Sequence, residues 1–235
     1  MLAGPSNWEP PGPRDIVKGR IEVPTHGGQL LVDLIIDRSF QYSYIASMAR
    51  TKEFDKDEAL IAAIEVFREH GFEGASTEML VGAMKIGRQS LYDTFGDKWK
   101  LYCLAVERYS ADEASAHIAV MRGEPNALDG IRAMILRVIE NAGKACLGVN
   151  SICEFGQSRP DLSALRNAAD RRLKAAACER IGEAQLAGDV DKSLSAEAVA
   201  DFLFANIAGM RIAVRAGAGR DHLQSLGQLA IRAIT

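Results

Sequence analysis

The sequence lacks the features that mark membrane, secreted and metal-clustering proteins. It has no apolar run of about 18 residues that could cross a membrane, and no N-terminal signal peptide. Its four cysteines, Cys103, Cys146, Cys153 and Cys178, show neither the paired spacing of a zinc site nor that of a small disulfide scaffold. We therefore expect a cytoplasmic protein with reduced thiols, no bound metal and no cofactor.

Catalytic motifs are also missing. There is no Gly-x-Ser-x-Gly elbow, no phosphate-cradling glycine loop and no His-Glu-x-x-His segment. The four histidines, His26, His70, His117 and His222, are scattered and form no metal-binding pattern. The chain is therefore not expected to be an enzyme, although a helical enzyme or small-molecule-binding protein without DNA binding is the rival class.

Charge gives little indication of a nucleic-acid partner. The net charge is −3 and the pI is about 5.9, so any surface that binds DNA must be local. The stretch 85–100 is such a place, because its basic residues Lys85, Arg88, Lys98 and Lys100 outnumber Asp93 and Asp97.

What the sequence does contain is a helical pattern. With 235 residues and 48% apolar content it can build a sizeable core. Helical periodicity and capping residues after Met48 predict an all-α protein of about nine helices. The expected helical segments are 55–70, 76–84, a short helix that includes 88–92, 97–121, 125–142, a broken region at 143–157, 160–186, 195–216 and 220–235.

Residues 1–47 differ from the rest of the chain. Pro5, Pro10, Pro11 and Pro13 break regular structure. The segment 29–36 is an apolar run of strand type for which the sequence shows no partner strand. Met48 to Lys52 reads like a second protein start with a basic arm. We therefore expect 1–47 to be an extension that is disordered or precedes the true start.

Two helices around a short turn at 76–92 have the size of a helix-turn-helix, whose second helix can enter a DNA major groove. This segment resembles the TetR family of transcriptional repressors. The residues that carry the resemblance are Gly71-Phe72, Ser76-Thr77, Ile86, Ser90-Leu91-Tyr92, Phe95, Lys98 and Leu101. The resemblance implies a DNA-binding domain at 48–101 and a helical ligand-binding and dimerisation domain at 102–235.

Aligned to the family pattern, Arg88 and Gln89 occupy base-reading positions, with Ser90 beside them. Arginine can pair with guanine and glutamine with adenine in the major groove. Tyr92 matches the family's phosphate-contacting tyrosine. Lys98 matches the lysine at the start of the family's fourth helix, and Thr77 the hydroxyl residue at the start of its second helix. Two residues depart from the pattern: Lys85 stands where the turn usually has glycine, and Gly87 where the second helix usually has a serine cap.

The resemblance further implies a homodimer, a double-stranded operator and a small-molecule effector that releases the repressor from a palindromic site. The effector would shift the helix 97–121 and so the spacing of the two recognition helices. Apolar residues at helical spacing within 195–216 predict the dimer face: Leu203, Phe204, Ile207 and Arg211. The predicted ligand-binding residues are Leu104, Arg108, Ile135, Ile139, Asn150, Phe155 and Leu173.

Cys146 and Cys153 leave an alternative open. They fall seven residues apart, in a segment whose Cys146 and Asn150 partly match a Gly-Cys-x-x-x-Asn sequence of one branch of the family. A thiol or metal sensor that uses both is the alternative to a pocket for an organic effector.

Overall fold

The computed structural model describes residues 16–25, 28–37 and 54–235. The chain divides into two units, Met1–Phe54 and Asp55–Thr235. In the first unit, β1 (Ile16–Thr25) pairs with β2 (Gly28–Asp37) in an antiparallel hairpin, with Ile16 opposite Asp37 and Thr25 opposite Gly28. The prolines of 5–13 and the segment Met48 to Lys52 lie outside the described residues.

The hairpin corrects the expectation that the apolar run 29–36 has no partner strand. Its partner, β1, alternates apolar Val17, Ile21 and Val23 with charged residues between them. Such a period of two is typical of a strand. Charged residues at alternate positions mask this short apolar series in the sequence, and for that reason a strand was not expected there.

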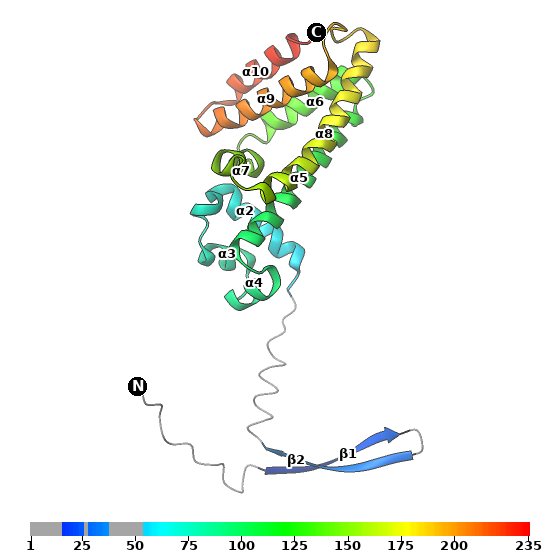
Figure 1. The fold of residues 1–235 in the computed structure, drawn as a ribbon, viewed down its shortest axis with the longest axis vertical. Helices are drawn as coiled ribbons and strands as arrows, with labels where there is room; N and C mark the ends of the chain where they lie inside the picture. The colour runs from blue at the N-terminus through cyan, green and yellow to red at the C-terminus, as the bar shows by residue number, and fades with distance from the viewer. Residues whose placement is uncertain (1–15, 26–27, 38–53) are drawn as a thin grey trace. The chain divides into compact units, whose positions relative to one another are not determined.

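The second unit is helical, as predicted, and the described residues contain nine helices (Figure 1). They are α2 (Lys56–Gly74), α3 (Thr77–Met84), α4 (Arg88–Phe95), α5 (Lys98–Gly123), α6 (Ala127–Glu140), α7 (Leu147–Phe155), α8 (Pro160–Ala187), α9 (Ala196–Arg215) and α10 (Arg220–Arg232). Among these helices, none combines the length and apolarity that a membrane span requires.

Local capping residues explain where most of these helices begin. Asp55 accepts hydrogen bonds from the backbone N–H groups of Asp57 and Glu58 at the start of α2. Asp97 caps α5 and Ser195 caps α9 in the same way, which satisfies donors that the first helical turn leaves free. Pro160 occupies the first turn of α8, where its missing N–H costs nothing.

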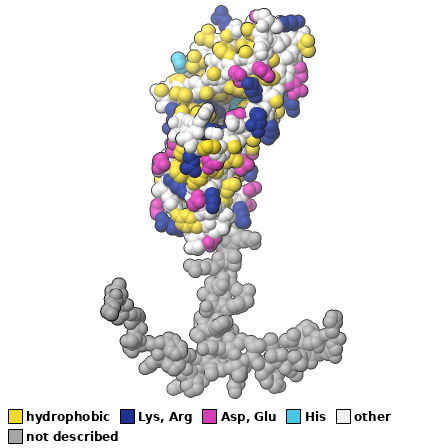
Figure 2. All heavy atoms as spheres, in the orientation of Figure 1, with side chains coloured by type: hydrophobic (Ala, Val, Ile, Leu, Met, Phe, Trp, Pro, Cys, Tyr) yellow, Lys and Arg dark blue, Asp and Glu magenta, His cyan; other side chains and the backbone are white. Residues whose placement is uncertain are grey.

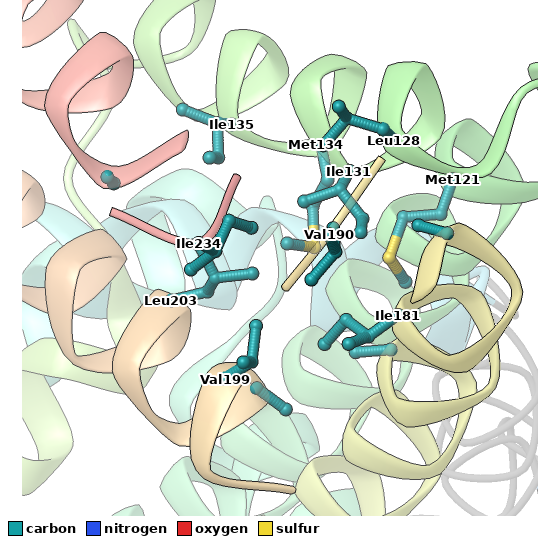
Figure 3. Packing of buried hydrophobic residues seen from close by; sticks show 14 of the residues in the cluster. Met121, Leu128, Ile131, Met134, Ile135, Ile181, Val190, Val199, Leu203 and Ile234 are labelled. Atoms are coloured by element: carbon teal, nitrogen blue, oxygen red, sulfur yellow. The ribbon is translucent and has the colours of Figure 1, made fainter. Parts of the chain in front are cut away.

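A hydrophobic core holds α5, α6, α8, α9 and α10 together. Its fully buried members include Ile131 and Met134 of α6, Ile181 of α8 and Leu203 of α9. Figure 3 shows these side chains converging, with Val190 and Ile234 between the helices. The long helix α5 also packs on α2, so it joins the predicted DNA-binding helices to the core.

Candidate nucleic-acid interface and adjoining cavity

The turn between α3 and α4 accommodates the two residues that depart from the family pattern. Lys85 ends α3 in the left-handed region, with φ 55° and ψ 35°, and its N–H donates to the carbonyl oxygen of Val81. Gly87 precedes α4 in an extended conformation and has no side chain to cap it. The two departures from the family pattern therefore leave the turn intact.

Buried residues fix the orientation of α4. Leu91 and Phe95 are 1% and 8% exposed, and they lie on the side of the helix that faces α3 and α5. Arg88, Gln89 and Tyr92 are exposed on the remaining surface. The structure thus brings the predicted base-reading side chains to one outward surface of a short helix.

In the free protein, acidic neighbours hold two of these side chains. Arg88 Nη2 forms an ion pair with Glu78 Oε1 of α3. Gln89 Nε2 donates to Asp93 Oδ1 at 2.8 Å. A hydrogen bond from the backbone, and then the charge of Arg88, hold the pKa of the Glu78 carboxyl below its usual value. To contact a base, Arg88 and Gln89 would have to leave Glu78 and Asp93 and bind to DNA instead.

The flanking positions lie on the neighbouring helices. Thr77 is half-buried in the first turn of α3 and Ser90 is half-buried on α4. Lys98 opens α5, and its Nζ lies 4.5 Å from the centre of the Phe72 ring. Such a cation–π contact holds an ammonium group in place, so Lys98 is anchored between α2 and α5.

A bend in α2 connects the DNA-binding helices to α7. Gly71 has φ 69°, which interrupts the regular helix and favours glycine. The N–H groups of Phe72 and Glu73 donate to Glu154 of α7 at 3.0 and 2.9 Å. The Glu154 carboxylate therefore satisfies two backbone donors that the bend releases.

A second set of contacts strengthens this junction. Asn150 Nδ2 donates to the carbonyl oxygen of Arg68 at 2.9 Å, and Arg68 Nε donates to that of Ala145 at 2.8 Å. Arg215 of α9 donates to Asn150 Oδ1. Asn150, a predicted ligand-binding residue, thus links α7 to α2 and α9.

Aromatic rings fill the space beneath the bend. Phe72 contacts Trp99, Tyr102 and Phe155, with ring centres 5.2 to 5.7 Å apart. Trp99 Nε1 donates to Asp161 Oδ2 of α8 at 2.8 Å. Phe155, also predicted to bind ligand, lies in this cluster, which joins α2, α5 and α7.

A cavity of about 490 Å³ lies between α5, α7, α8 and α9, and we call it the central cavity. Of the seven predicted ligand-binding residues, all of them described, Leu173 alone lines it. Leu104 is 41% exposed on α5, and Arg108 pairs with Asp57 and Asp112 on the surface. The positions of Leu104 and Arg108 outside the cavity do not support a role in ligand binding, which stays a prediction.

The other predicted positions lie elsewhere. Ile135 and Ile139 face α10, where a Cβ atom on Gly227 would lie 2.9 and 3.3 Å from their side chains. Asn150 lines a neighbouring space of about 250 Å³ with Cys146 and Arg211. Sequence reasoning missed the charged residues of the central cavity, although an arginine such as Arg211 on an apolar helix face was a visible signal.

The two candidate sensor thiols lie at opposite ends of α7. All four cysteines, each within the described residues, are free. Cys146 precedes α7 and lines the central cavity, whereas Cys153 is exposed. Seven residues of helix separate them by about 10 Å, which is too far for a disulfide or a shared metal ion. No group of three or more metal-ligating side chains occurs in the described part of the chain.

The predicted dimer face of α9 packs within its own subunit. Leu203 is buried in the core, Phe204 and Ile207 line the central cavity, and Arg211 approaches Glu113. The exposed apolar residues of the last two helices are different ones: Phe202 (40%) and Ile212 (51%) on α9 and Leu229 (58%) on α10. Figure 2 shows many hydrophobic side chains on the part of the helical unit where α9 and α10 lie.

Comparison with known proteins agrees with this layout. Residues 59–102 match the family described as bacterial regulatory proteins of the tetR family. The chain is 32% identical over 184 residues to the uncharacterized HTH-type transcriptional regulator YezE of Bacillus subtilis (strain 168), covering 75% of this chain and 94% of YezE. It is 27% identical to the HTH-type transcriptional repressor ComR of Escherichia coli (strain K12), covering 79% and 91% of the two chains.

A solved structure shows the same fold with DNA. A cysteine-substituted variant of the TetR family regulator CifR, complexed with 26-base-pair operator DNA, superposes with a TM-score of 0.66. It is 28% identical and covers 78% of this chain and 99% of its own. The helix-turn-helix geometry, the helical core behind it and these similarities show that the chain belongs to the TetR family of transcriptional regulators.

Proposed function

We propose that this chain is a homodimeric repressor that binds a palindromic operator through α4 and is released by a small molecule in the central cavity. The observation that carries the proposal is the exposed surface of Arg88, Gln89 and Tyr92 on a helix fixed by buried Leu91 and Phe95. The related ComR is named a repressor, and the related CifR variant is complexed with operator DNA. Binding to chromosomal DNA would place the protein in the cytoplasm.

We assign no catalytic activity to the chain. Its relatives are transcriptional regulators, and its buried charged groups serve packing and ligand binding in this proposal. A gel shift of DNA from the upstream region of its own gene tests the DNA-binding function directly. Failure to shift any such fragment or selected operator would contradict it.

Replacing Arg88 by alanine is expected to relax base preference, whereas Tyr92→Phe and Lys98→Ala should weaken binding to all sequences alike. Arg88 can reach base edges, and one good pair of hydrogen bonds to a base contributes about 1–3 kcal/mol of discrimination. Tyr92 and Lys98 flank it and would contact phosphates, which carry no sequence information. Gel shifts against single-base operator variants at fixed salt measure both effects.

Arg122→Ala is the matched control. Arg122 is also an exposed arginine in an ion pair, with Glu179, but it lies in the last turn of α5. The Arg122→Ala protein should bind every operator variant with the same affinity as the parent protein. If Arg88→Ala lost affinity equally for all variants, Arg88 would be a phosphate contact instead.

The junction between α2 and α7 supports a route from the cavity to the DNA. Cys146, Val149 and Ile152 line the central cavity, and Glu154 on the same short helix bonds to the bend of α2. A ligand that moves α7 would therefore move the helix that packs on α3. A coupling of about 1–3 kcal/mol would change operator affinity about 5- to 150-fold. This route adds to the shift of α5 inferred from the family resemblance.

Glu154→Gln is expected to loosen this junction and lower stability by about 1–2 kcal/mol. The carboxylate receives two backbone hydrogen bonds, and the amide oxygen would accept them more weakly without its charge. Chemical denaturation measures the loss, and hydrogen exchange at the amide of Phe72 locates it. Glu107→Gln, an exposed glutamate on α5, is the control and should leave both unchanged. Equal protection of Phe72 in Glu154→Gln and the parent would contradict the role of Glu154.

A further inference from the structure

A charged cluster lies beside the central cavity, where α5, α6 and α9 meet. Arg137 Nη2 donates to Glu113 Oε1 at 2.8 Å, and Arg137 Nη1 donates to Glu113 Oε2 at 3.1 Å. Arg211 Nη2 lies 3.7 Å from the same Oε2. Among the described residues, the cluster thus sets two guanidinium groups against one carboxylate. Glu113 and Arg211 line the cavity, so the surplus positive charge lies at its wall.

His117 adds a hydrogen-bond donor but no charge. Its Nε2 lies 3.2 Å from Arg137 Nη1, and a guanidinium nitrogen can only donate, so Nε2 accepts and the ring proton is on Nδ1. Burial, together with the charge of Arg137, lowers the pKa of His117 to about 4, and the ring is uncharged at neutral pH. Its buried Nδ1 has no hydrogen-bond partner among the described residues.

Arg211 is buried without a close partner for its charge. Its side chain is 7% exposed, and its contacts within the described structure are long: 3.7 Å to Glu113 Oε2 and 3.4 Å to the carbonyl oxygen of Asn141. Arg166, equally buried on another wall of the cavity, donates to Ser151 Oγ, Ser163 Oγ and the carbonyl oxygen of Gly156 at 2.9 to 3.2 Å. A buried charge without such contacts is costly, which sets Arg211 apart.

We propose that the central cavity takes an effector with one carboxylate group and an apolar body, and that Arg211 binds the carboxylate. This inference rests on the proposed function and names the chemical class of the effector. The planar fork of a guanidinium matches a carboxylate in geometry and charge, and the acceptor oxygens also suit the Nδ1–H of His117. A volume of about 490 Å³ is in the range of small-molecule sites. The apolar body would lie on Val149, Ile152, Leu173, Phe204 and Ile207.

The test compares carboxylates with amides of the same shape. The probes are phenylacetate, indole-3-acetate and octanoate, each paired with its primary amide, and binding to the full chain is measured by thermal shift and titration calorimetry. At least one carboxylate is expected to bind about tenfold or more tightly than its amide, because charged hydrogen bonds exceed neutral ones by that much. Equal binding of acid and amide in every pair, or no binding by any of the three acids, would overturn the proposal.

Two substitutions and a control locate the site. Arg211→Met should abolish the preference for the acid, and Arg211→Lys should retain part of it, since lysine keeps the charge without the fork. Arg171→Gln removes an exposed charge from the rim of the same cavity and should leave the preference unchanged. Two results would overturn the assignment. The first is that Arg211→Met still binds the acid more tightly than the amide, and the second is that Arg171→Gln loses this preference as fully as Arg211→Met does. If Arg211→Met does not fold, Arg211→Lys decides: its acid preference should be smaller than that of the parent, and an undiminished preference would overturn the assignment.

Operator binding in the absence of any probe separates this inference from the proposed function. A parent protein that shifts operator DNA but shows no acid preference would contradict the inference alone. A protein that binds the acids but shifts no DNA would contradict the proposed function and leave the cavity assignment standing.

Discussion

A protein that carries both Phe202→Glu and Ile212→Glu is expected to be monomeric and to bind a two-half-site operator at least about 100-fold more weakly than the parent. Both side chains are about half exposed on α9. They are about 80° apart around the helix axis, and both point away from the side on which Leu203 and Met210 are buried. An uncompensated charge buried in an interface costs about 3–5 kcal/mol, and every 1.4 kcal/mol is a factor of ten. Light scattering measures the mass, and a gel shift the affinity.

The control for this experiment is Leu104→Glu. Leu104 is 41% exposed on α5, so the change is chemically matched but lies on a helix outside the proposed interface. All three substitutions occur at exposed positions and should leave the folded protomer intact by circular dichroism. If the double variant remained a dimer, the interface would not include Phe202 and Ile212. It would then be formed by the face predicted from sequence, with Leu203, Phe204 and Ile207, or by another helix.

The two faces of α9 show the limit of periodicity as evidence. A pattern of apolar residues predicts that a helix has an apolar face, and α9 carries apolar residues on both sides. Leu203 and Met210 are buried within the subunit, whereas Phe202 and Ile212 are exposed. The side of α9 that packs on the core of its own subunit is decided by contacts with α6, α8 and α10. The residues of these helices are not neighbours of the α9 residues in the sequence. The periodicity therefore predicts the helix, but the face that was expected to form the dimer is the one that packs within the subunit.

Local signals, by contrast, predicted local structure well. The caps Asp55, Asp97 and Ser195 lie where a helix was expected to begin, because a cap bonds to backbone groups two or three residues away. Lys85 stands where the family pattern has glycine, and it adopts a positive φ in the turn between α3 and α4, a conformation that glycine adopts most readily. These features need no knowledge of the tertiary fold.

The charged cluster beside the central cavity could not be predicted in this way. Glu113 and His117 are on α5, Arg137 on α6 and Arg211 on α9. Arg211 stands out in the sequence on an apolar helix face, but nothing in the sequence brings it together with the other three. Their contacts span up to 98 residues, as between Glu113 and Arg211, and exist only once three helices cross. Arg108 and Leu104, chosen as pocket residues from their helix alone, lie on the outer surface of α5.

Gly130→Ala is expected to lower the free energy of unfolding by about 3 kcal/mol, at the upper end of the usual cost of overpacking a core. Gly130 of α6 lies against the last turns of α5, and a Cβ atom there would overlap the carbonyl oxygen of Met121. Backbone cannot rotate away as a side chain can. Ile131 and Leu128 beside it are buried in the core, so a shift of α6 would disturb packing on α8 as well.

Gly182→Ala is the matched control, since Gly182 also lies within a helix, α8, but apart from its own stretch of that helix no described atom lies within 4 Å of the added Cβ. Alanine there should raise stability by up to about 1 kcal/mol through helix propensity. Urea unfolding of both variants at one protein concentration gives the two changes, and opposite signs are expected from the same chemical substitution. If Gly130→Ala unfolded at the urea concentration of the parent, the α5–α6 crossing would have room for a methyl group, and the close approach at Met121 would not contribute to the stability of the helical core.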